Sequence, residues 1–390
     1  MSETKKKIAI IGGGISGLSI AYYLIKKGFK PTIFDPNPYE NASFCSQGVA
    51  TSKGLKEARK PLFRAKLSGH VLLEKIILDI ESHYPGLVLH KKGVFEPFGS
   101  NDEYLSKVQR IYRWDKPEDF GVKVINRQSR ASAEKEAFEK MNVDAEGALF
   151  YPEDYFFNTP LFLESLTRYL AEKGCEFVSK VAKILQAKQK DLEKSPTYQI
   201  DGRDFDHVFL CCSVGMNELL TASGLKPIKS RLKSGITLEI SSNSMDFHGI
   251  KSGLHSINFL GQLRVGSHDY VGEPSKQVFE KARDFLSGFF HKFFSAQKFE
   301  LSSFSLDENP NAASRYLKGT RVNGWDRNPL VGSLNISDPL WKNVWISSGF
   351  HKSGYCLGPY FGRLLVDTLS QGSCDFTHPL IHGDLLNTHT

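Results

Sequence analysis

Residues 8–35 read IAIIGGGISGLSIAYYLIKKGFKPTIFD, and this stretch determines the class of fold. Ile8 to Ile11 predict a short buried strand, and Leu18 to Lys27 have the apolar spacing of a helix. Pro31 to Phe34 predict a second strand, which Asp35 follows directly. A strand, a glycine-rich turn, a helix, a second strand and an acid, in that order, are typical of the first βαβ unit of a dinucleotide-binding domain.

The glycines of this unit each have a physical task. Gly12 permits the tight turn, Gly14 lets a pyrophosphate approach the backbone, and Gly17 lets the helix pack closely on the strand. Asp35 lies 18 residues after Gly17. This is near the ~20 residues expected for the acid that binds the ribose hydroxyls. The motif therefore predicts dinucleotide binding, but by itself it leaves NAD and FAD both open.

Composition limits the rest of the chain. With 390 residues, 40% apolar and 24% charged, it has the make-up of an ordinary globular protein, either of two or three domains or of one large nucleotide-binding domain with an insertion. The net charge of +7 permits an anionic ligand or nucleic acid without requiring either. No cysteine pair or Cys/His spacing indicates a metal site, so we expect reduced thiols in a cytoplasmic protein. The cysteines are Cys45, Cys175, Cys211, Cys212, Cys356 and Cys374.

The N-terminus resembles a secretory signal at first sight, because lysines precede an apolar run from Ile8 to Ile25. Gly12, Gly13 and Gly14 interrupt that run, and Lys26-Lys27-Gly28 follows it where a signal has a cleavage site. No other segment has the ~18–20 uninterrupted apolar residues of a membrane span. We therefore expect a cytoplasmic protein without a membrane span.

Two interleaved domains are expected. The nucleotide-binding domain takes residues 1–55, 147–224 and 323–390, and the second domain takes 56–146 and 225–322. In the first, we expect helices from Thr159 to Lys173, Met216 to Ser223 and Tyr360 to Ser370, and strands from Cys175 to Ile184, Asp206 to Cys212 and Val344 to Ser347, with a hairpin tip from Gln186 to Ser195. In the second, we expect helices from about Pro61 to His83 and from Ser275 to Phe294, with strands from Gly235 to Ile240, Gly253 to Phe259 and Gly261 to Gly266.

Two C-terminal segments carry a family resemblance. Residues 319–332, GTRVNGWDRNPLVG, resemble the G-x-R-…-D-x-x-P-x-x-G segment of the D-amino-acid oxidase superfamily. Residues 347–359, SSGFHKSGYCLGP, resemble its G-H-x-x-x-G-x-x-x-A-P flavin-binding motif, with Phe350 in place of the usual histidine. The likeness is to the glycine oxidase and D-amino-acid dehydrogenase branch. Residues 42–49, ASFCSQGV, also resemble the A-S-G-N-R-Q-G-A loop in the oxidoreductase domain of the bifunctional wobble-uridine tRNA-modifying enzyme.

The resemblance implies an α/β fold, α+β overall. A Rossmann-like FAD-binding domain of the glutathione-reductase type would interleave with a substrate domain of β-sheet and helices. It implies FAD bound in an extended form, and the absence of a cysteine near Arg321, where sarcosine oxidases attach their flavin, implies that the FAD is non-covalent. The implied contacts are Gly12, Gly14, Ile15, Ser16 and Asp35 for pyrophosphate and ribose; Ala42, Ser43, Gln47 and Gly48 beside the flavin; Val181, Cys212 and Ser213 near the adenine; and Gly349, Lys352, Ser353, Gly354, Tyr355, Cys356 and Leu357 at the pyrimidine edge.

The resemblance also implies the chemistry, which is oxidation of the C–N bond of an amino acid or N-substituted glycine by hydride transfer to flavin N5. We expect Arg321 to hold the substrate carboxylate, with Lys352 as a second contact, since a guanidinium can meet a carboxylate with two parallel hydrogen bonds. The alternative is a structural ion pair of Arg321, for example with Asp326. Arg264 stands at a place that resembles that of the sarcosine-oxidase lysine which helps the reduced flavin react with oxygen. Because arginine replaces lysine there, we expect slow turnover with oxygen. The electron acceptor could then be oxygen or a quinone.

A tRNA substrate is the alternative. The carboxymethylaminomethyl group of a wobble uridine is itself an N-substituted glycine, so a similar site could remove its carboxymethyl group. Lys226, Lys229, Arg231 and Lys233 form a basic cluster in the sequence that leans towards RNA, although such runs are more often solvated faces. A non-catalytic flavoprotein is a third, weaker interpretation.

Overall fold

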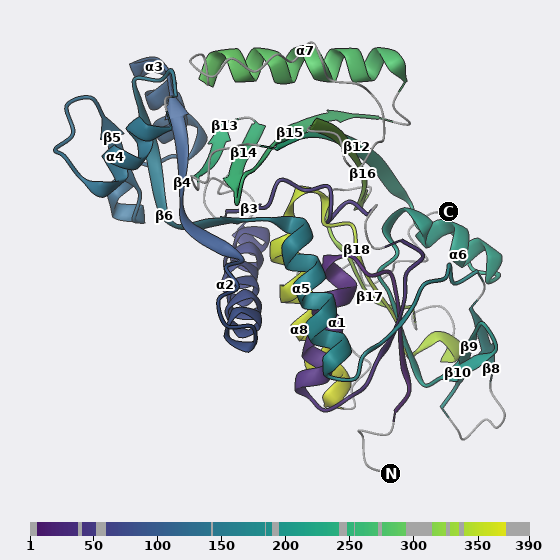
Figure 1. Ribbon diagram of the computed structural model, residues 1–390. Helices are drawn as coiled ribbons and strands as arrows, with labels where there is room; N and C mark the ends of the chain where they lie inside the picture. The colour runs from purple at the N-terminus through teal and green to yellow at the C-terminus, as the bar shows by residue number, and fades with distance from the viewer. Residues whose placement is uncertain are drawn as a thin grey trace.

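The structure is a computed structural model, and it describes residues 6–37, 41–51, 60–141, 143–183, 185–188, 195–241, 248–252, 254–271, 275–293, 314–324, 328–334 and 339–371. In these residues the strands form sheets of six, nine and three strands. Figure 1 shows α1 and α8 side by side, and the large sheet above them with α7 across its outer side. The expected α/β class is confirmed.

The six-stranded sheet belongs to the nucleotide-binding part. Its order is β17-β18-β11-β1-β2-β7, and all neighbours are parallel except β17 and β18. The strands are β17 (Leu330–Ser333), β18 (Val344–Ser348), β11 (His207–Leu210), β1 (Ile8–Ile11), β2 (Thr32–Phe34) and β7 (Glu176–Val178). Residues of β1, β2, β11, β17 and β18 are buried, as expected for a parallel sheet covered on both faces.

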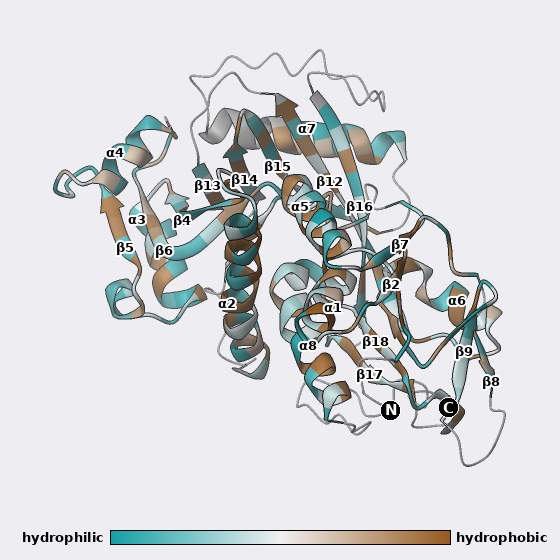
Figure 2. Cartoon of the chain, turned by 60° about the horizontal axis from the view of Figure 1, so that its bottom comes forward, coloured by the Kyte–Doolittle hydropathy of each residue, from teal (hydrophilic) through white to brown (hydrophobic). Residues whose placement is uncertain are grey.

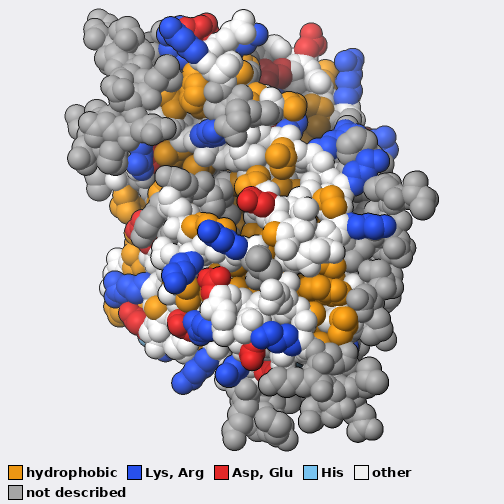
Figure 3. All heavy atoms as spheres, turned by 90° about the vertical axis from the view of Figure 1, so that its right-hand side faces the viewer, with side chains coloured by type: hydrophobic (Ala, Val, Ile, Leu, Met, Phe, Trp, Pro, Cys, Tyr) orange, Lys and Arg blue, Asp and Glu red, His pale blue; other side chains and the backbone are white. Residues whose placement is uncertain are grey.

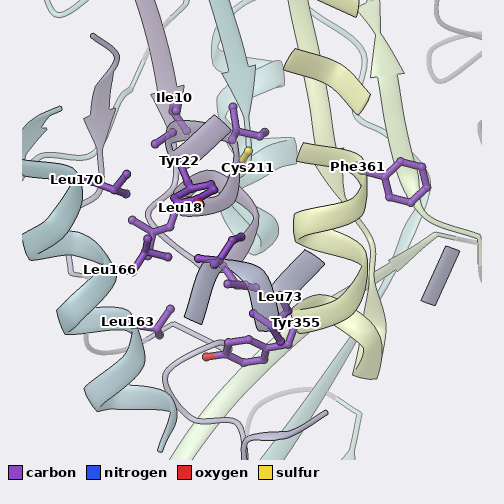
Figure 4. Packing of buried hydrophobic residues seen from close by; sticks show 14 of the residues in the cluster. Ile10, Leu18, Tyr22, Leu73, Leu163, Leu166, Leu170, Cys211, Tyr355 and Phe361 are labelled. Atoms are coloured by element: carbon purple, nitrogen blue, oxygen red, sulfur yellow. The ribbon is translucent and has the colours of Figure 1, made fainter. Parts of the chain in front are cut away.

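Four helices build the largest core against this sheet. They are α1 (Ile15–Lys26), α2 (Lys60–His83), α5 (Thr159–Glu172) and α8 (Gly354–Ser370). In Figure 4, Leu163, Leu166 and Leu170 of α5 point towards Leu18 and Tyr22 of α1. Hydrophobic and hydrophilic residues alternate along α2 in Figure 2, as expected for a helix with one buried face.

The nine-stranded sheet dominates the second part. Its order is β16-β12-β15-β14-β13-β4-β6-β3, and β5 also pairs with β6. The strands are β16 (Ser314–Gly324), β12 (Ser230–Ser241), β15 (Gln262–Tyr270), β14 (Leu254–Phe259), β13 (His248–Ser252), β4 (His90–Phe98), β6 (Gly147–Phe157), β3 (Val49–Ala50) and β5 (Lys123–Asn126). Thus β3 and β6, which we had assigned with the nucleotide-binding segments, pair within this sheet.

Smaller elements complete the fold. A three-stranded sheet consists of β10 (Arg203–Phe205), β9 (Thr197–Ile200) and β8 (Gln186–Lys188). The tip of the expected hairpin, residues 189–194, lies outside the described residues. The remaining helices are α3 (Asn101–Leu105), α4 (Ala133–Lys140), α6 (Met216–Ala222) and α7 (Lys276–Phe293), with short helical turns η3 (Ser106–Ile111), η4 (Pro117–Phe120), η5 (Ser213–Gly215), η8 (Pro339–Trp341) and η9 (His351–Ser353).

Several element boundaries differ from those expected, and three of the differences lie in the nucleotide-binding part. Helix α1 begins at Ile15 and α8 at Gly354, both earlier than the apolar periodicity indicated. Local glycine and proline content hid the start of α8, which includes Pro359. In the fold α8 packs on α1, and a Cβ on Gly358 would meet the Ile15 carbonyl oxygen at 3.4 Å, an ordinary van der Waals distance. The expected strand from Cys175 to Ile184 is formed only at Glu176–Val178.

Candidate active site

One edge of the six-stranded sheet collects the residues expected to bind a dinucleotide. The parallel strands β1, β2, β11 and β18 end next to Gly12, Asp35, Cys211 and Gly349, respectively. Because the carboxyl ends of parallel strands lie at one edge, these residues meet there although they are far apart in the sequence. In open α/β sheets this edge is the usual place for a bound nucleotide.

The glycine-rich turn at this edge has no room for side chains on its inner side. Gly12 has a φ of +108°, and a Cβ there would lie 2.5 Å from the Cys211 carbonyl oxygen. A Cβ on Gly17 would collide with the Gly12 carbonyl oxygen. At Gly14, by contrast, the nearest atom to such a Cβ is Ser43 Oγ at 3.2 Å, and no other heavy atom among the described residues lies within 4 Å. The tight turn and the helix–strand contact expected of Gly12 and Gly17 are therefore present.

The start of α1 is suited to a phosphate. Its first turn carries no acidic side chain, and its N-cap, Gly14, has no side chain to cap it. Ser43 Oγ accepts a hydrogen bond from the Ile15 amide at 3.1 Å. Asp35 lies beside the turn, where it accepts hydrogen bonds from the Gly13 amide and, at 2.9 Å, from the Asn37 amide.

The start of α8 lies next to Ser43 as well. Gly349 has a φ of +75°, and a Cβ there would be 2.9 Å from the Leu330 amide nitrogen. The Tyr355 hydroxyl donates a 2.9 Å hydrogen bond to the Ser43 carbonyl oxygen. The first turn of α8 also lacks acidic side chains. Two helix starts thus converge on Ser43, and together with the glycine turn they fit the extended FAD that we expected.

Ser16, in the first turn of α1, also lies at this edge of the sheet. Its hydroxyl is buried and donates a 2.9 Å hydrogen bond to the Ser347 carbonyl oxygen at the end of β18. It therefore fixes α1 against β18 rather than facing a ligand. The expected adenine neighbour Val181 is 56% exposed. Ser213, after β11, has a φ of +44°.

Residues 42–48 form a loop that packs on the large sheet, and we call it the flavin loop. Three glycines, Gly235, Gly319 and Gly266, lie on the same face of β12, β16 and β15. A Cβ on Gly319 would lie 3.2 Å from Ala42 Cα, and one on Gly266 would lie 2.7 Å from Gln47 Nε2. The lack of side chains therefore lets the loop approach the sheet closely.

Hydrogen bonds hold the flavin loop in this position. Gln47 Nε2 donates to Thr237 Oγ1, and Thr237 Oγ1 donates to the Cys45 carbonyl oxygen at 2.9 Å. The Gly48 carbonyl oxygen accepts from the Phe157 amide at 2.8 Å. The loop that we expected beside the flavin is therefore fixed by the large sheet.

Arg264, on β15 of the large sheet, holds the flavin loop through hydrogen bonds. Its side chain is fully buried. Nη1 donates to the carbonyl oxygens of Phe44 at 2.9 Å and Ser46 at 3.0 Å and to Thr159 Oγ1 at 2.6 Å. Nε donates to Glu239 Oε2 at 2.6 Å. These contacts give Arg264 a role in holding the loop, whereas a role in the reaction with oxygen stays a prediction.

Charged side chains gather at the other end of the glycine-lined face. Asp269 Oδ1 is 2.5 Å from Arg321 Nη2, and Asp269 Oδ2 is 2.7 Å from Lys352 Nζ and 3.9 Å from Lys233 Nζ. We call these four residues the Asp269 cluster. The structure therefore brings together Arg321 and Lys352, which we had singled out. Asp326, the alternative partner of Arg321, lies outside the described residues.

Sequence reasoning missed Asp269 and the role of Lys233. No motif includes either residue, because they reach the site only through strand pairing. Lys233 pairs with Arg321 across β12 and β16, and Asp269 pairs with Gly235 across β15 and β12. Arg321 and Asp269 are thus two strands apart and meet over Gly235, which has no side chain to separate them.

His351 lies beside the cluster. Burial, followed by the nearby positive charges of Arg321 and Lys352, lowers its pKa from 6.5 to about 4. Its φ is +53°, an unusual value for a non-glycine residue. At neutral pH the imidazole is therefore uncharged, and its surroundings disfavour an added positive charge.

Comparison with known proteins adds to this geometry. Residues 7–368 match the DAO family, described as FAD dependent oxidoreductase. The chain belongs to the DAO family of FAD-dependent oxidoreductases. Its cofactor is therefore FAD, and the expected family and enzyme class are confirmed.

Solved structures of the DAO type share the fold. Glycine oxidase from Geobacillus kaustophilus superposes with a TM-score of 0.72 at 16% identity, over 99% of this chain and 100% of that chain. Iminodiacetate oxidase from Chelativorans sp. BNC1 gives 0.73 at 17% identity, over 96% and 97%. L-Proline dehydrogenase from P. horikoshii gives 0.67 at 17% identity, over 96% and 95%.

A curated relative matches only locally. L-Aspartate oxidase from Pyrococcus furiosus is 44% identical over 45 residues, which are 11% of this chain and 10% of that protein. Within the described residues no helix combines the length and apolar character needed to cross a bilayer. The five cysteines in the described part are free thiols, and Cys374 lies outside it.

Proposed function

We propose that this DAO-family protein oxidises the C–N bond of an amino acid or N-substituted glycine, using FAD that is held non-covalently. One observation carries the proposal: Arg321 and Lys352, from β16 and the turn before α8, face the same carboxylate. Their shared contact with the Asp269 carboxylate supports a carboxylate as the group that these cations would bind in a substrate. Since Lys352 belongs to residues 349–357, the carboxylate-binding place lies next to the expected flavin contacts.

The chain's own groups have two tasks in such a reaction. When bound, FAD would supply the acceptor for a hydride from the carbon that bears the amine. Arg321 and Lys352 would hold the substrate carboxylate and so fix the position and angle of that carbon. The amine must be neutral to release a hydride, so a substrate that binds as an ammonium ion must lose a proton before that step.

The substrate class is supported by the site and by the names of similar structures. Glycine and iminodiacetate are amine-carboxylates, and proline is a cyclic one. Such molecules present a carboxylate and an amine on the same carbon, which suits a carboxylate clamp next to a hydride acceptor. The electron acceptor, oxygen or a quinone, stays open, and slow oxygen turnover remains a prediction.

An RNA substrate gains no support from the described residues. Of the expected basic cluster, Lys233 is turned to Asp269 at 3.9 Å. Figure 3 shows the face next to α6 and the small sheet, and Lys and Arg are spread over it with Asp and Glu among them. The wobble-uridine reaction therefore stays a sequence-based alternative.

Anaerobic flavin bleaching tests the proposal. The purified protein is mixed without oxygen with glycine, sarcosine, iminodiacetate, L-proline and D-amino acids, and the flavin absorbance is followed. Bleaching by at least one of these amine-carboxylates, and none by the matching plain carboxylates, is the expected result. If only carboxymethylaminomethyl-modified tRNA bleaches the flavin, the free amino-acid substrate is wrong.

A further inference from the structure

The Asp269 cluster places a negative charge inside a carboxylate clamp. The side chains of Asp269 and Arg321 are each only 16% exposed, whereas those of Lys352 and Lys233 are 48% and 41% exposed. The pair of Asp269 and Arg321 is therefore the best shielded from water, and charge–charge interactions are strongest there. A ligand that takes Arg321 must compete with Asp269.

A plain carboxylate competes poorly for this place. By binding Arg321 and Lys352 it would bring a second negative charge close to Asp269 and remove hydrogen-bond partners from it. A partly buried carboxylate that loses its partners costs free energy, and like charges at short range repel. The contacts of Asp269 with Arg321 and Lys352 therefore disfavour the binding of anions that carry no positively charged group.

An amine-carboxylate competes differently. Its carboxylate replaces Asp269 at Arg321, and its ammonium group, one carbon away, replaces Arg321 at Asp269. Arg321 would then face the ligand carboxylate, and Asp269 would face the ligand ammonium group. The charges of the protein and of the ligand are therefore complementary. On this face of the sheet Gly235 lies between Asp269 and Arg321 and leaves no side chain between them, while the flavin loop packs on the neighbouring Gly319.

We propose that Asp269 contacts the substrate amine and makes the site selective for amine-carboxylates over plain carboxylates. This inference takes one point from the proposed function, namely that the substrate carboxylate binds at Arg321 and Lys352. Asp269 acts at the binding step, by charge, as a specificity-determining residue. It differs from a purely structural partner of Arg321, whose removal would weaken all carboxylate ligands alike.

Two ligands of the same shape test this selectivity. Trimethylglycine and 3,3-dimethylbutyrate differ only in that a quaternary nitrogen replaces a quaternary carbon. Trimethylglycine has no lone pair on nitrogen and no N–H, so it is not oxidised and its binding is measured at equilibrium. Titration calorimetry on the FAD-loaded protein, with flavin absorbance as a second signal, gives both dissociation constants.

The wild type should bind trimethylglycine roughly tenfold more tightly than 3,3-dimethylbutyrate, the ratio that one favourable charge pair of ~1.4 kcal/mol gives. In Asp269→Asn the preference should vanish, with 3,3-dimethylbutyrate binding about tenfold more tightly than before. Asp269→Glu, which keeps the charge, should keep the preference. Asp119→Asn, at an exposed position in η4, is the matched control and should behave as the wild type.

Two results would overturn the inference. One is a wild type without any preference for trimethylglycine, and the other is an Asp269→Asn variant that keeps the preference or binds both ligands more weakly. The FAD content and the melting temperature of each variant show whether it is folded. If Asp269→Asn is not folded, Asp269→Glu provides the test instead. If the preference is present but no amine bleaches the flavin, the proposed function fails and the binding inference stands.

Discussion

Arg321 is the side chain whose replacement tests the site most directly. It lies on β16, pairs with Asp269 and is 16% exposed. Its partner is itself held by Lys352, so loss of Arg321 leaves Asp269 with a cation. A change in substrate handling can therefore be separated from a change in folding.

Arg321→Met keeps the bulk of the side chain and removes the two-pronged hydrogen-bond donor. We expect kcat/KM for an amine-carboxylate to fall by about 2–4 kcal/mol, the scale for losing one side of a shielded charge pair. FAD content and melting temperature should barely change, and Lys226→Met, an exposed lysine, is the control. Loss of FAD or of the fold, with an unchanged KM, would show that Arg321 is structural.

His207 gives a prediction for pH. Burial, followed by the charge of Lys6, lowers its pKa from 6.5 to about 4 in the folded protein, so the unfolded chain binds a proton first as pH falls. The contribution of His207 to the free energy of unfolding is fully present above pH 6.5, and it is lost as the pH falls from 6.5 to 4. The loss between pH 7.5 and pH 5 should be about 2 kcal/mol.

Urea unfolding of His207→Val at both pH values measures this contribution. The variant should lose about 2 kcal/mol less than the wild type between pH 7.5 and pH 5, because valine has no proton to bind. Equal losses in the two proteins would mean that His207 does not titrate in this range.

Among the helices, α8 has the most demanding position, because its start must meet both the flavin loop and α2. Gly69 of α2 lies so close to α8 that a Cβ there would collide with the Cys356 carbonyl oxygen. Cys356 is in the first turn of α8, next to Tyr355, which holds Ser43 of the flavin loop. The α2–α8 crossing therefore sets the position of a helix start expected to bind the flavin.

Gly69→Ala should separate α2 from α8. We expect a loss of about 1–3 kcal/mol in stability, the usual range for overpacking, together with weaker FAD binding. Gly288→Ala, at an exposed position in helix α7, is the matched control, since a Cβ there meets no atom within 4 Å among the described residues. Ultrafiltration gives the FAD dissociation constant and thermal unfolding the stability. If Gly69→Ala keeps the FAD affinity of the control, this crossing does not position α8.

For the molecule as a whole, the two parts are joined by the flavin loop. Residues 42–48 come directly after the first βαβ unit, yet Arg264 and Thr237 of the large sheet hold them. FAD that binds along this loop would touch both parts at once. We therefore expect FAD to be non-covalent but tightly held, and its removal to lower the stability of the whole molecule.

Acid precipitation checks the mode of attachment. The yellow colour should pass into the supernatant, because no cysteine occupies the position near Arg321 at which a thioether would form. Heating the FAD-loaded and FAD-free proteins should give a higher melting temperature for the loaded form. Flavin that stays in the pellet would contradict non-covalent binding.

Local sequence sufficed for the nucleotide-binding unit. Gly12, Gly17 and Asp35 lie within 30 residues of one another, and steric limits on a tight turn and a close helix–strand contact leave few residue types that fit there. The segments around Arg321 and Gly349 were likewise visible as short motifs. The family follows from these patterns, because each motif is contiguous in the chain.

The Asp269 cluster could not be obtained in this way. Asp269, Lys233 and Arg321 come from three strands and Lys352 from a turn, and only the pairing order β16-β12-β15 brings them to one place. The same holds for Arg264, whose carbonyl partners Phe44 and Ser46 are more than 200 residues away in the chain. Strand register is set by packing over the whole sheet, so the partners of these charges follow from the tertiary structure alone.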